Sequence, residues 1–307
     1  MTNSKKTDLL YLIDGSGYIF RAFYALPPLT RKSDGMPVGA VSGFCNMIYK
    51  FLEDSKSKND HEKPTHIAVI FDTARKNFRN NIYPEYKANR SETPEDLIPQ
   101  FSFIREAVKA FNLPSIEMEN YEADDLIATF STKQKGSIRI VTGDRDLFQL
   151  VDDKKDIKVI YLAKGISNHD LVDLQWISRK YEIPGERYGL FAMIRGDSSD
   201  GLPGIRGIGE KGAASIANQF ERLEEVMSAA VNGDERLTPN LCKKLLASAD
   251  YAAIAPKLVS CATDIALPEM SIDLPTKPKS MEKINFLKEE YGLGTSIDRI
   301  VSALGWI

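Results

Sequence analysis

The sequence predicts an α/β fold in which helices cover both faces of a parallel sheet. Short apolar runs have the length and composition of buried strands, namely LLYLI (9–13), HIAVIF (66–71), IRIVT (138–142) and KVIYL (158–162). Helical apolar patterns alternate with them, at roughly 40–53, 97–111, 123–134 and 170–181. Alternating strands and helices are typical of parallel sheets with two covered faces.

Acidic residues follow three of the four predicted strands. The first strand ends at Asp14, the second at Asp72, and the third is followed by Asp144 and Asp146, whereas the fourth has no acid at its end. In parallel sheets, functional groups gather in the crevice beyond the carboxyl ends of the strands. We therefore expect these aspartates to share one edge of the sheet.

The helix predicted from residue 123 opens with a concentration of acids, in YEADDLIATF at 121–130. Glu122, Asp124 and Asp125 fall directly before a buried apolar pattern. Helix N-termini favour acidic residues, but one cap does not require three carboxylates. Like charges this close disfavour each other's ionised forms. A cation shared at the same sheet edge is the simplest explanation.

A further pair of acids lies in RGDSSDGLPG, at 195–204. Asp197 and Asp200 are three positions apart, on an expected turn or first helical turn. Beyond this segment the chain reads as helical, with glycine and proline breaks and no clear strand. A boundary near 185 then divides the sequence into an α/β domain at 1–185 and a helical region at 186–307.

Together these acids form a predicted metal site of nine carboxylates: Asp14, Asp72, Glu122, Asp124, Asp125, Asp144, Asp146, Asp197 and Asp200. An all-oxygen set without histidine suits Mg²⁺ or Mn²⁺ rather than zinc. The set exceeds what one magnesium ion needs, which indicates two ions clamping a phosphodiester. Each acid alone is equally well explained as a turn, cap or surface residue, so the common edge is what favours a site.

The segment 75–90, RKNFRNNIYPEYKANR, is locally basic although the whole chain has a formal net charge of −3. Five basic residues against one glutamate give 5 − 1 = +4, and the basic residues are Arg75, Lys76, Arg79, Lys87 and Arg90. Phe78, Tyr83 and Tyr86 lie among them. Basic residues that grip phosphates and aromatic rings that stack on bases are typical of a single-strand channel. A solvated charged face is the plain alternative.

A glycine-rich stretch, LPGIRGIGEKGAASIA at 202–217, precedes another predicted helix. Gly204, Gly207 and Gly209 come before a helix start near Glu210, and Lys211 adds a positive charge in its first turn. Free N–H groups at a helix start suit a phosphate. The spacing does not match a P-loop. We expect a hairpin that contacts duplex backbone without reading bases.

The composition points to an intracellular protein. Three scattered cysteines without a CxxC pair argue against a disulfide framework or a thiolate zinc site. The N-terminal stretch MTNSKKTDLLYLIDGSG lacks the apolar core of a signal peptide, and no apolar run approaches the ~20 residues of a membrane span. We expect a cytoplasmic protein without a membrane partner.

The chain resembles the 5′ nuclease domain of bacterial DNA polymerase I, which is similar to phage 5′ exonucleases and flap endonucleases. The resemblance extends over essentially the whole chain and is carried by LIDGSGYIFRAFYALPPLT, VIFDTARKNFRNNIYPEYKANR, YEADDLIATF, VTGDRDLFQLV and MIRGDSSDGLPGIRGIGEKGA. It implies a PIN-like domain with a helical arch at about 75–105, then a helical DNA-binding region with a helix-hairpin-helix-type motif at about 200–220.

The resemblance also implies an activity, partners and site residues. The activity is divalent-metal-dependent 5′-3′ exonuclease and flap endonuclease cleavage in primer removal and DNA repair. The partners are DNA with a 5′ flap or nick, RNA–DNA primer junctions, and a DNA polymerase, fused or separate. All nine acids match metal-site positions, with Asp124 and Asp144 among the catalytic residues.

The basic segment and the hairpin carry further expectations from the same resemblance. Lys87 and Arg90 fall on arch positions that contact the scissile phosphate, and Tyr86 on a stacking position. Arg21 and Arg79 match basic positions near the 5′ strand. In relatives, hairpin carbonyls at the positions of Gly207 and Gly209 hold a monovalent cation, here K⁺, on the duplex.

Two positions depart from the family pattern. Relatives usually carry threonine where this chain has Gly212, and asparagine where it has Gly201. Both changes put duplex affinity in question, but neither touches a carboxylate. Two other functions stay open: a general PIN-type ribonuclease acting on single strands, against which the hairpin argues, and a non-catalytic DNA-junction binder, against which the full set of acids argues.

Overall fold

The computed structural model describes residues 8–56, 63–163, 165 and 168–306. Within these residues one sheet is formed in the order β3-β2-β1-β4-β5-β6. Its strands are β1 (Leu9–Asp14), β2 (His66–Ile70), β3 (Ser115–Ile116), β4 (Ser137–Thr142), β5 (Ile157–Tyr161) and β6 (Asp170–Val172). Adjacent strands are parallel except β6, which runs antiparallel to β5.

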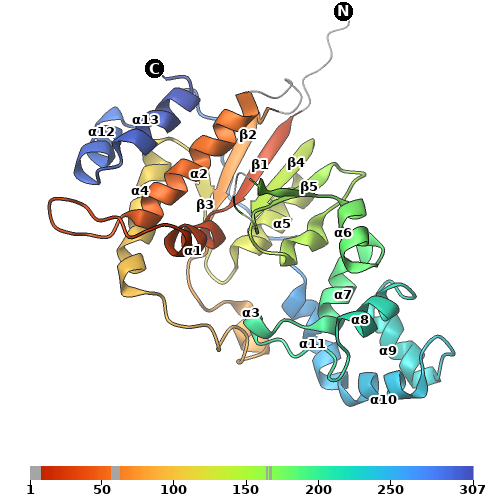
Figure 1. The fold of residues 1–307 in the computed structure, drawn as a ribbon. Helices are drawn as coiled ribbons and strands as arrows, with labels where there is room; N and C mark the ends of the chain where they lie inside the picture. Colours follow the sequence, from red (N-terminus) through yellow and green to blue (C-terminus); the bar gives the residue numbers. More distant parts are fainter. Residues whose placement is uncertain (1–7, 57–62, 164, 166–167, 307) are drawn as a thin grey trace, which may run out of the picture.

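Both faces of the sheet are covered, as Figure 1 shows. One face packs on α2 (Gly39–Lys56), α4 (Ile98–Ala110), α12 (Met281–Glu290) and α13 (Gly294–Ala303), with α1 (Gly15–Ala25) beside α2. The other packs on α5 (Ala123–Lys133), α6 (Leu174–Tyr181) and α7 (Tyr188–Arg195). Successive residues of a strand point to opposite faces, so Leu10 and Leu12 enter one core while Tyr11 and Ile13 enter the other. This double burial explains the uninterrupted apolar runs.

The central strands and three helices lie where the sequence predicts them, but one predicted helix is wrong at its start. Residues 170–172 form β6 instead of the first turn of a helix over 170–181. The reason is local: the Asp173 side chain accepts a hydrogen bond from the Trp176 N–H at 2.7 Å and caps α6 there. The strand β3 and the helix α1 have no counterpart in the sequence prediction.

The segment 75–105 is only partly helical. It contains α3 (Phe78–Ile82), a 3-10 turn (Glu95–Leu97) and the first residues of α4. From Tyr83 to Pro94 the described chain runs in turns without an α-helix, where the resemblance predicts an arch. Pro99 occupies the first turn of α4, where proline is tolerated.

The helices of the predicted region 186–307 pack on two different cores. Helices α8 (Glu210–Ala217), α9 (Leu223–Asn232), α10 (Pro239–Ala247) and α11 (Ala249–Val259) follow α7 and share its core (Figure 1). In contrast, α12 and α13 return to the first face, because Ile297, Ile300 and Val301 form an apolar stripe buried against α2. No helix in the described parts of the chain is long and apolar enough to cross a membrane.

Replacing Ile300 with alanine should therefore destabilise the α/β domain itself. The side chain is fully buried, and the lost contacts and the cavity should lower the free energy of unfolding by about 2–5 kcal/mol. Urea denaturation measures the change, with exposed Thr295→Ala on the same helix as control. An Ile300→Ala protein as stable as the parent would show that α13 is dispensable to this core.

Candidate active site

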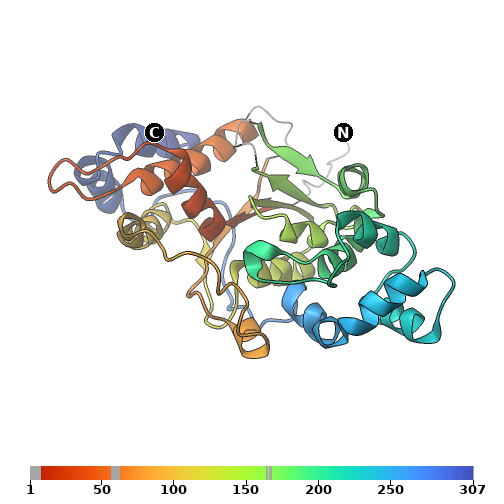
Figure 2. The same cartoon turned by 60° about the horizontal axis from the view of Figure 1, so that its bottom comes forward.

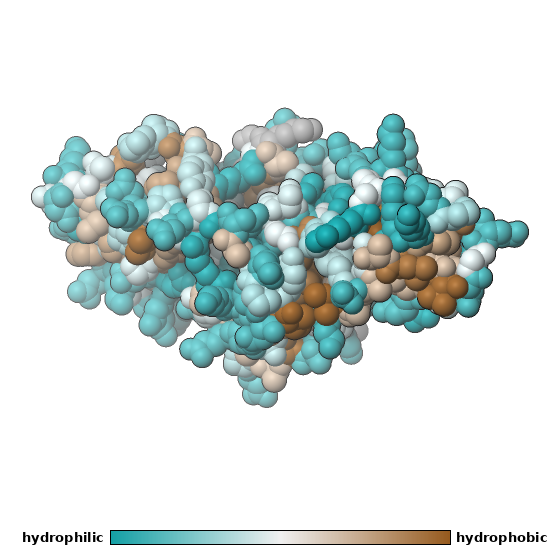
Figure 3. Space-filling model, turned by 90° about the horizontal axis from the view of Figure 1, so that it is seen from below, coloured by the Kyte–Doolittle hydropathy of each residue, from teal (hydrophilic) through white to brown (hydrophobic). Residues whose placement is uncertain are grey.

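The predicted aspartates do meet at one edge of the sheet. Parallel pairing aligns Asp14 with Ile70, and Ile13 with Val141, so β1, β2 and β4 end together. A cleft of about 420 Å³ opens beyond these ends, lined by Asp14, Arg21, Asp144, Asp146, Asp197 and Asp200 among others. Figure 2 turns this edge toward the reader, and hydrophilic residues dominate the middle of the face in Figure 3.

Asp14 is fixed where β1 passes into α1. Its Oδ1 accepts a hydrogen bond from the Gly17 N–H, and its Oδ2 accepts one from the Thr142 hydroxyl, both at 2.8 Å. A Cβ at Gly17 would lie 2.3 Å from Oδ2, so glycine is required there. The Thr142 oxygen in turn accepts a bond from the Asp144 N–H at 2.9 Å. Sequence reasoning missed Thr142, although a hydroxyl directly before Gly-Asp was a visible signal.

The N-terminus of α5 brings the second group of acids to the same place. Glu122 is the N-cap residue and Asp124 lies in the first turn. Asp72, at the end of β2, accepts a hydrogen bond from the Ala123 N–H at 2.7 Å through its Oδ1. The strand end and the helix start are thus joined directly, which holds Asp72, Glu122 and Asp124 near one another.

The last two acids come from a turn before the hairpin. Asp197 caps the 3-10 turn Ser198–Asp200 by accepting a hydrogen bond from the Ser199 N–H. Arg145, which the sequence analysis did not single out, binds the Asp197 carboxylate at 2.7 Å. This ion pair ties the turn to the loop that carries Asp144 and Asp146.

Several carboxylates of the site have raised pKa values. Burial, with the charges of neighbouring carboxylates added to it, raises the pKa of Asp14 and of Asp146 to about 7. The same causes raise the pKa of Asp72, Asp124 and Asp144. These carboxylates are hard to ionise because they are buried close together. A divalent cation prefers oxygen ligands and would offset their negative charge, so the group suits such an ion. As the side chains stand, no three of the described residues are grouped closely enough to hold an ion.

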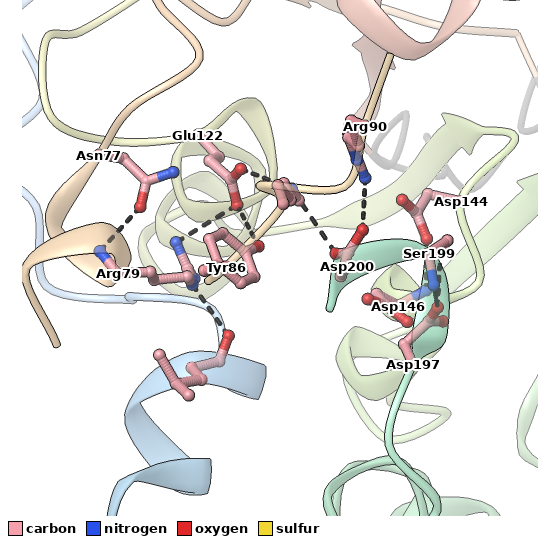
Figure 4. Close-up of polar contacts among 12 residues, drawn as sticks. Asn77, Arg79, Tyr86, Arg90, Glu122, Asp144, Asp146, Asp197, Ser199 and Asp200 are labelled. Carbon is pink, nitrogen blue, oxygen red and sulfur yellow. Dashed lines mark hydrogen bonds and ion pairs between the residues drawn. The ribbon is translucent and has the colours of Figure 1, made fainter. Parts of the chain in front are cut away.

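Two cations of the basic segment enter this cluster. The Lys87 ammonium lies 2.5 Å from Glu122 Oε1 and 3.7 Å from Asp200 Oδ2. The Arg90 guanidinium lies 2.5 Å from Asp200 Oδ1. Figure 4 shows Asp200 between Arg90 and the Glu122 side of the site. Lys87 and Arg90 therefore lie among the acids.

Gly201 allows this segment to dock. Its φ is +71°, and a Cβ would lie 2.7 Å from the Glu85 carbonyl oxygen. Next to it, the Lys87 N–H donates to the Asp200 carbonyl at 2.9 Å. A side chain at 201 would push the two segments apart, so this departure from the family pattern has a packing reason. Gly212 has one too, because a Cβ there would lie 2.8 Å from the Ile208 side chain.

The structure corrects the predictions for Asp125 and Arg79. Asp125 is fully buried and points away from the cleft, with both oxygens bonded to Arg79 at 2.6 and 2.7 Å. It also accepts hydrogen bonds from the N–H groups of Glu122 and Ala262. Arg79 is buried as well and donates to the Leu258 and Ser260 carbonyls. Neither is placed to bind metal or DNA; the pair joins α3, α5 and the C-terminal end of α11.

Tyr86 is also misassigned as a stacking residue. Its side chain is buried, and its hydroxyl donates to Glu122 Oε2 at 2.9 Å. A ring in this position has no face free for a base. Its role in this structure is to orient the Glu122 carboxylate, whose other oxygen binds Lys87.

The remaining predicted DNA-binding residues lie on the surface around the cleft. Arg75 and Lys76 are exposed before α3, and Arg21 lines the cleft from α1. Gly207, Gly209 and Lys211 are exposed at the start of α8. A second cleft of about 550 Å³ shares Arg145 and Asp197 with the first and reaches Glu210 at the start of α8.

The hairpin does not fit the expected K⁺ ion. The Gly207 carbonyl oxygen accepts a hydrogen bond from the Lys244 ammonium at 2.7 Å. A monovalent cation on this oxygen would meet a charge of its own sign. One of the two lone pairs of the Gly207 carbonyl oxygen therefore already accepts a bond from a cation.

Comparisons with known proteins give matches over nearly the whole chain. Residues 9–182 match the family of the 5′-3′ exonuclease N-terminal resolvase-like domain, and residues 183–282 match its C-terminal SAM fold. A DNA polymerase I of Rhizobium leguminosarum is 44% identical over 92% of this chain, which spans 28% of that polymerase. A 5′-3′ exonuclease of Streptomyces coelicolor is 36% identical over 95% of this chain and 99% of its own.

Solved structures share the fold at low identity. The T5 5′-exonuclease with bound zinc superposes with a TM-score of 0.61 at 18% identity, over 96% of this chain and 99% of its own. The catalytic core of Rad2 in complex with a DNA substrate gives 0.61 at 17% identity, over 99% and 95%. The α/β fold with a helical C-terminal region is thereby confirmed.

The position of Asp125 predicts a loss of stability on its removal. Asp125→Ala leaves the buried Arg79 guanidinium unpaired, which should lower the free energy of unfolding by about 3–5 kcal/mol. Urea denaturation measures this, and Asp34→Ala, which breaks an exposed ion pair with Arg31, should change little. A stable Asp125→Ala protein that has lost divalent-metal binding would instead make Asp125 a metal ligand.

Proposed function

Because this chain belongs to the 5′-3′ exonuclease family, as its sequence blocks indicated, we propose that its cleft cleaves 5′ flaps and 5′ ends at duplex junctions. The observation that carries the proposal is the gathering of eight carboxylates from separate segments at one sheet edge. They are Asp14, Asp72, Glu122, Asp124, Asp144, Asp146, Asp197 and Asp200. Lys87 and Arg90 lie among them.

These eight acids would hold the metal, as Mg²⁺ or Mn²⁺ and as two ions. When bound, the ions supply a water that ionises near neutral pH and positive charge for the leaving oxygen. The hard oxygen donors support this choice, and the T5 5′-exonuclease is a relative in fold that was solved with a divalent metal. Asp125 is left out, because both of its oxygens are bonded within the protein.

The chain's own cations would place the substrate. Lys87 and Arg90 reach the acids from the side of the basic segment, so a scissile phosphate held there would meet both side chains. Such charges, fixed before the reaction, stabilise charge that develops on the phosphate. Arg21, Arg75 and Lys76 would steer the 5′ single strand, and Gly209 and Lys211 would face the duplex.

One feature of the relatives extends the proposal to a setting in the cell. A DNA polymerase I carries a related segment, so we propose a DNA polymerase, fused or separate, as partner. RNA–DNA primer junctions are then natural substrates beside nicks and flaps in DNA. Cleavage of these substrates would take place in the cytoplasm of a bacterial cell.

The test is cleavage of a 5′-labelled flap duplex, with the matched single strand and an unstructured RNA beside it, in Mg²⁺ and in EDTA. We expect cutting at the flap junction in Mg²⁺ alone. Asp124→Ala and Asp144→Ala should abolish cutting while the flap duplex is still bound. Normal turnover by either variant would contradict the site.

Other results favour the alternatives. Equal cutting of the duplex, the single strand and the RNA would identify a general PIN-type ribonuclease. Binding of the flap duplex without cutting in any divalent metal would identify a junction-binding protein.

Lys87→Ala should lower the chemical rate far more than the affinity. A group that stabilises transition-state charge typically contributes about 10²–10³ in rate, and the dissociation constant should change much less. Single-turnover cleavage and binding to the flap duplex in EDTA separate the two, with exposed Lys154→Ala, outside the predicted DNA-binding residues, as the control. An effect confined to affinity would contradict a catalytic role for Lys87.

A further inference from the structure

The hairpin contains a lysine contact that connects two distant parts of the chain. Gly207 lies in the loop before α8, with φ +78°, and its carbonyl oxygen is 2.7 Å from the ammonium of Lys244 on α10. The two residues are 37 positions apart. An exposed loop carbonyl is thus bonded to a full positive charge from a separate helix.

The loop is shaped for this contact. A Cβ at Gly207 would lie 3.3 Å from Cε and 3.6 Å from Nζ of Lys244, so the glycine gives the lysine stem room to cross the loop. The residues before Gly207 are held in place. The Ile205 N–H donates to the Ile194 carbonyl at 2.9 Å, and the Arg206 N–H donates to the Ser248 hydroxyl at 3.2 Å.

The contact uses only part of the hydrogen-bonding capacity of the Lys244 ammonium. A lysine ammonium has three N–H donors, and the Gly207 carbonyl takes one. Within the described residues no other acceptor is bonded to Lys244. The side chain is half-buried, while Gly207 and Gly209 beside it are exposed. A duplex phosphate on this loop would therefore find a positive charge already fixed against the backbone.

We propose that Lys244 takes the place of a bound monovalent cation at the hairpin, so that duplex binding does not depend on K⁺. Like K⁺, the ammonium is a compact single charge that bonds to a carbonyl oxygen; unlike K⁺, it is covalently attached and always present. Lys244 is a positioning residue: it fixes the loop and its charge toward the DNA backbone. The inference rests on the proposed binding of duplex DNA at residues 204–212.

The experiment compares the binding of a 5′ flap duplex in KCl and in tetramethylammonium chloride, whose large cation cannot coordinate a carbonyl. Salt concentrations are equal, and EDTA prevents cleavage. The parent protein should bind equally, within about twofold, in both salts, since phosphate neutralisation alone depends on total salt. Lys244→Met should bind on the order of tenfold more weakly in tetramethylammonium, as expected for a lost charged hydrogen bond, and should recover in KCl.

The controls separate this role from simple loss of charge. Lys243→Met removes one exposed charge from the same helix and should show no preference for K⁺. Lys244→Arg keeps the charge and should remain independent of K⁺. A parent protein that binds several times more tightly in KCl, an unchanged Lys244→Met protein, or a loss that KCl does not repair would each overturn the inference.

The same data distinguish this inference from the proposed function. A parent protein with no preference for the flap duplex over its single strand, in either salt, would contradict duplex binding itself. A clear preference for the duplex that depends on K⁺ would contradict only the role of Lys244.

Discussion

The structure depends on how the chain tolerates like charges buried together. Carboxylates from β1, β2, β4, the start of α5 and the turn at 198–200 converge on one edge, where burial and mutual repulsion raise the pKa of Asp14 and Asp146 to about 7. Short hydrogen bonds from backbone N–H groups and from Thr142 hold these oxygens. Lys87, Arg90 and Arg145 supply positive charge from two other segments. A fold that keeps such a cluster in place has concentrated cation-binding groups where a phosphodiester can reach them.

The three acids of YEADDLIATF illustrate how neighbouring residues acquire different tasks. Successive residues of a helix point about 100° apart, so Asp124 and Asp125 cannot face the same side. Asp124 lies near enough to Asp14 and Asp144 for their charges to raise its pKa, and Glu122 pairs with Lys87, whereas Asp125 forms the buried pair with Arg79. That pair reaches the carbonyls of Leu258 and Ser260 and so joins α5 to the helical region. The crowding has two causes: two of the acids belong to the carboxylate cluster, and the third belongs to a buried ion pair.

Much of the fold and of the site could be predicted because the signals are local. Buried strands have apolar runs, parallel strands end at one edge, and acids after those runs must therefore meet. Pairings between residues far apart in the sequence produce no local pattern from which they could be predicted. Nothing near Asp125 indicates Arg79 as its partner, and nothing near Gly207 indicates Lys244. The stripe of Ile297, Ile300 and Val301 predicts a buried helix but not that it returns to α2. Asp173 could have placed the start of α6, since an aspartate before an apolar helical pattern is an ordinary cap.

If the buried carboxylates hold two cations and Asp125 holds none, diffraction at the manganese absorption edge will show it in crystals of the protein with Mn²⁺ and a flap duplex. We expect two anomalous peaks among the carboxylates of Asp14, Asp124, Asp144 and Asp146, and none beside Asp125. No peak within this cluster, or a peak coordinated by Asp125, would contradict it.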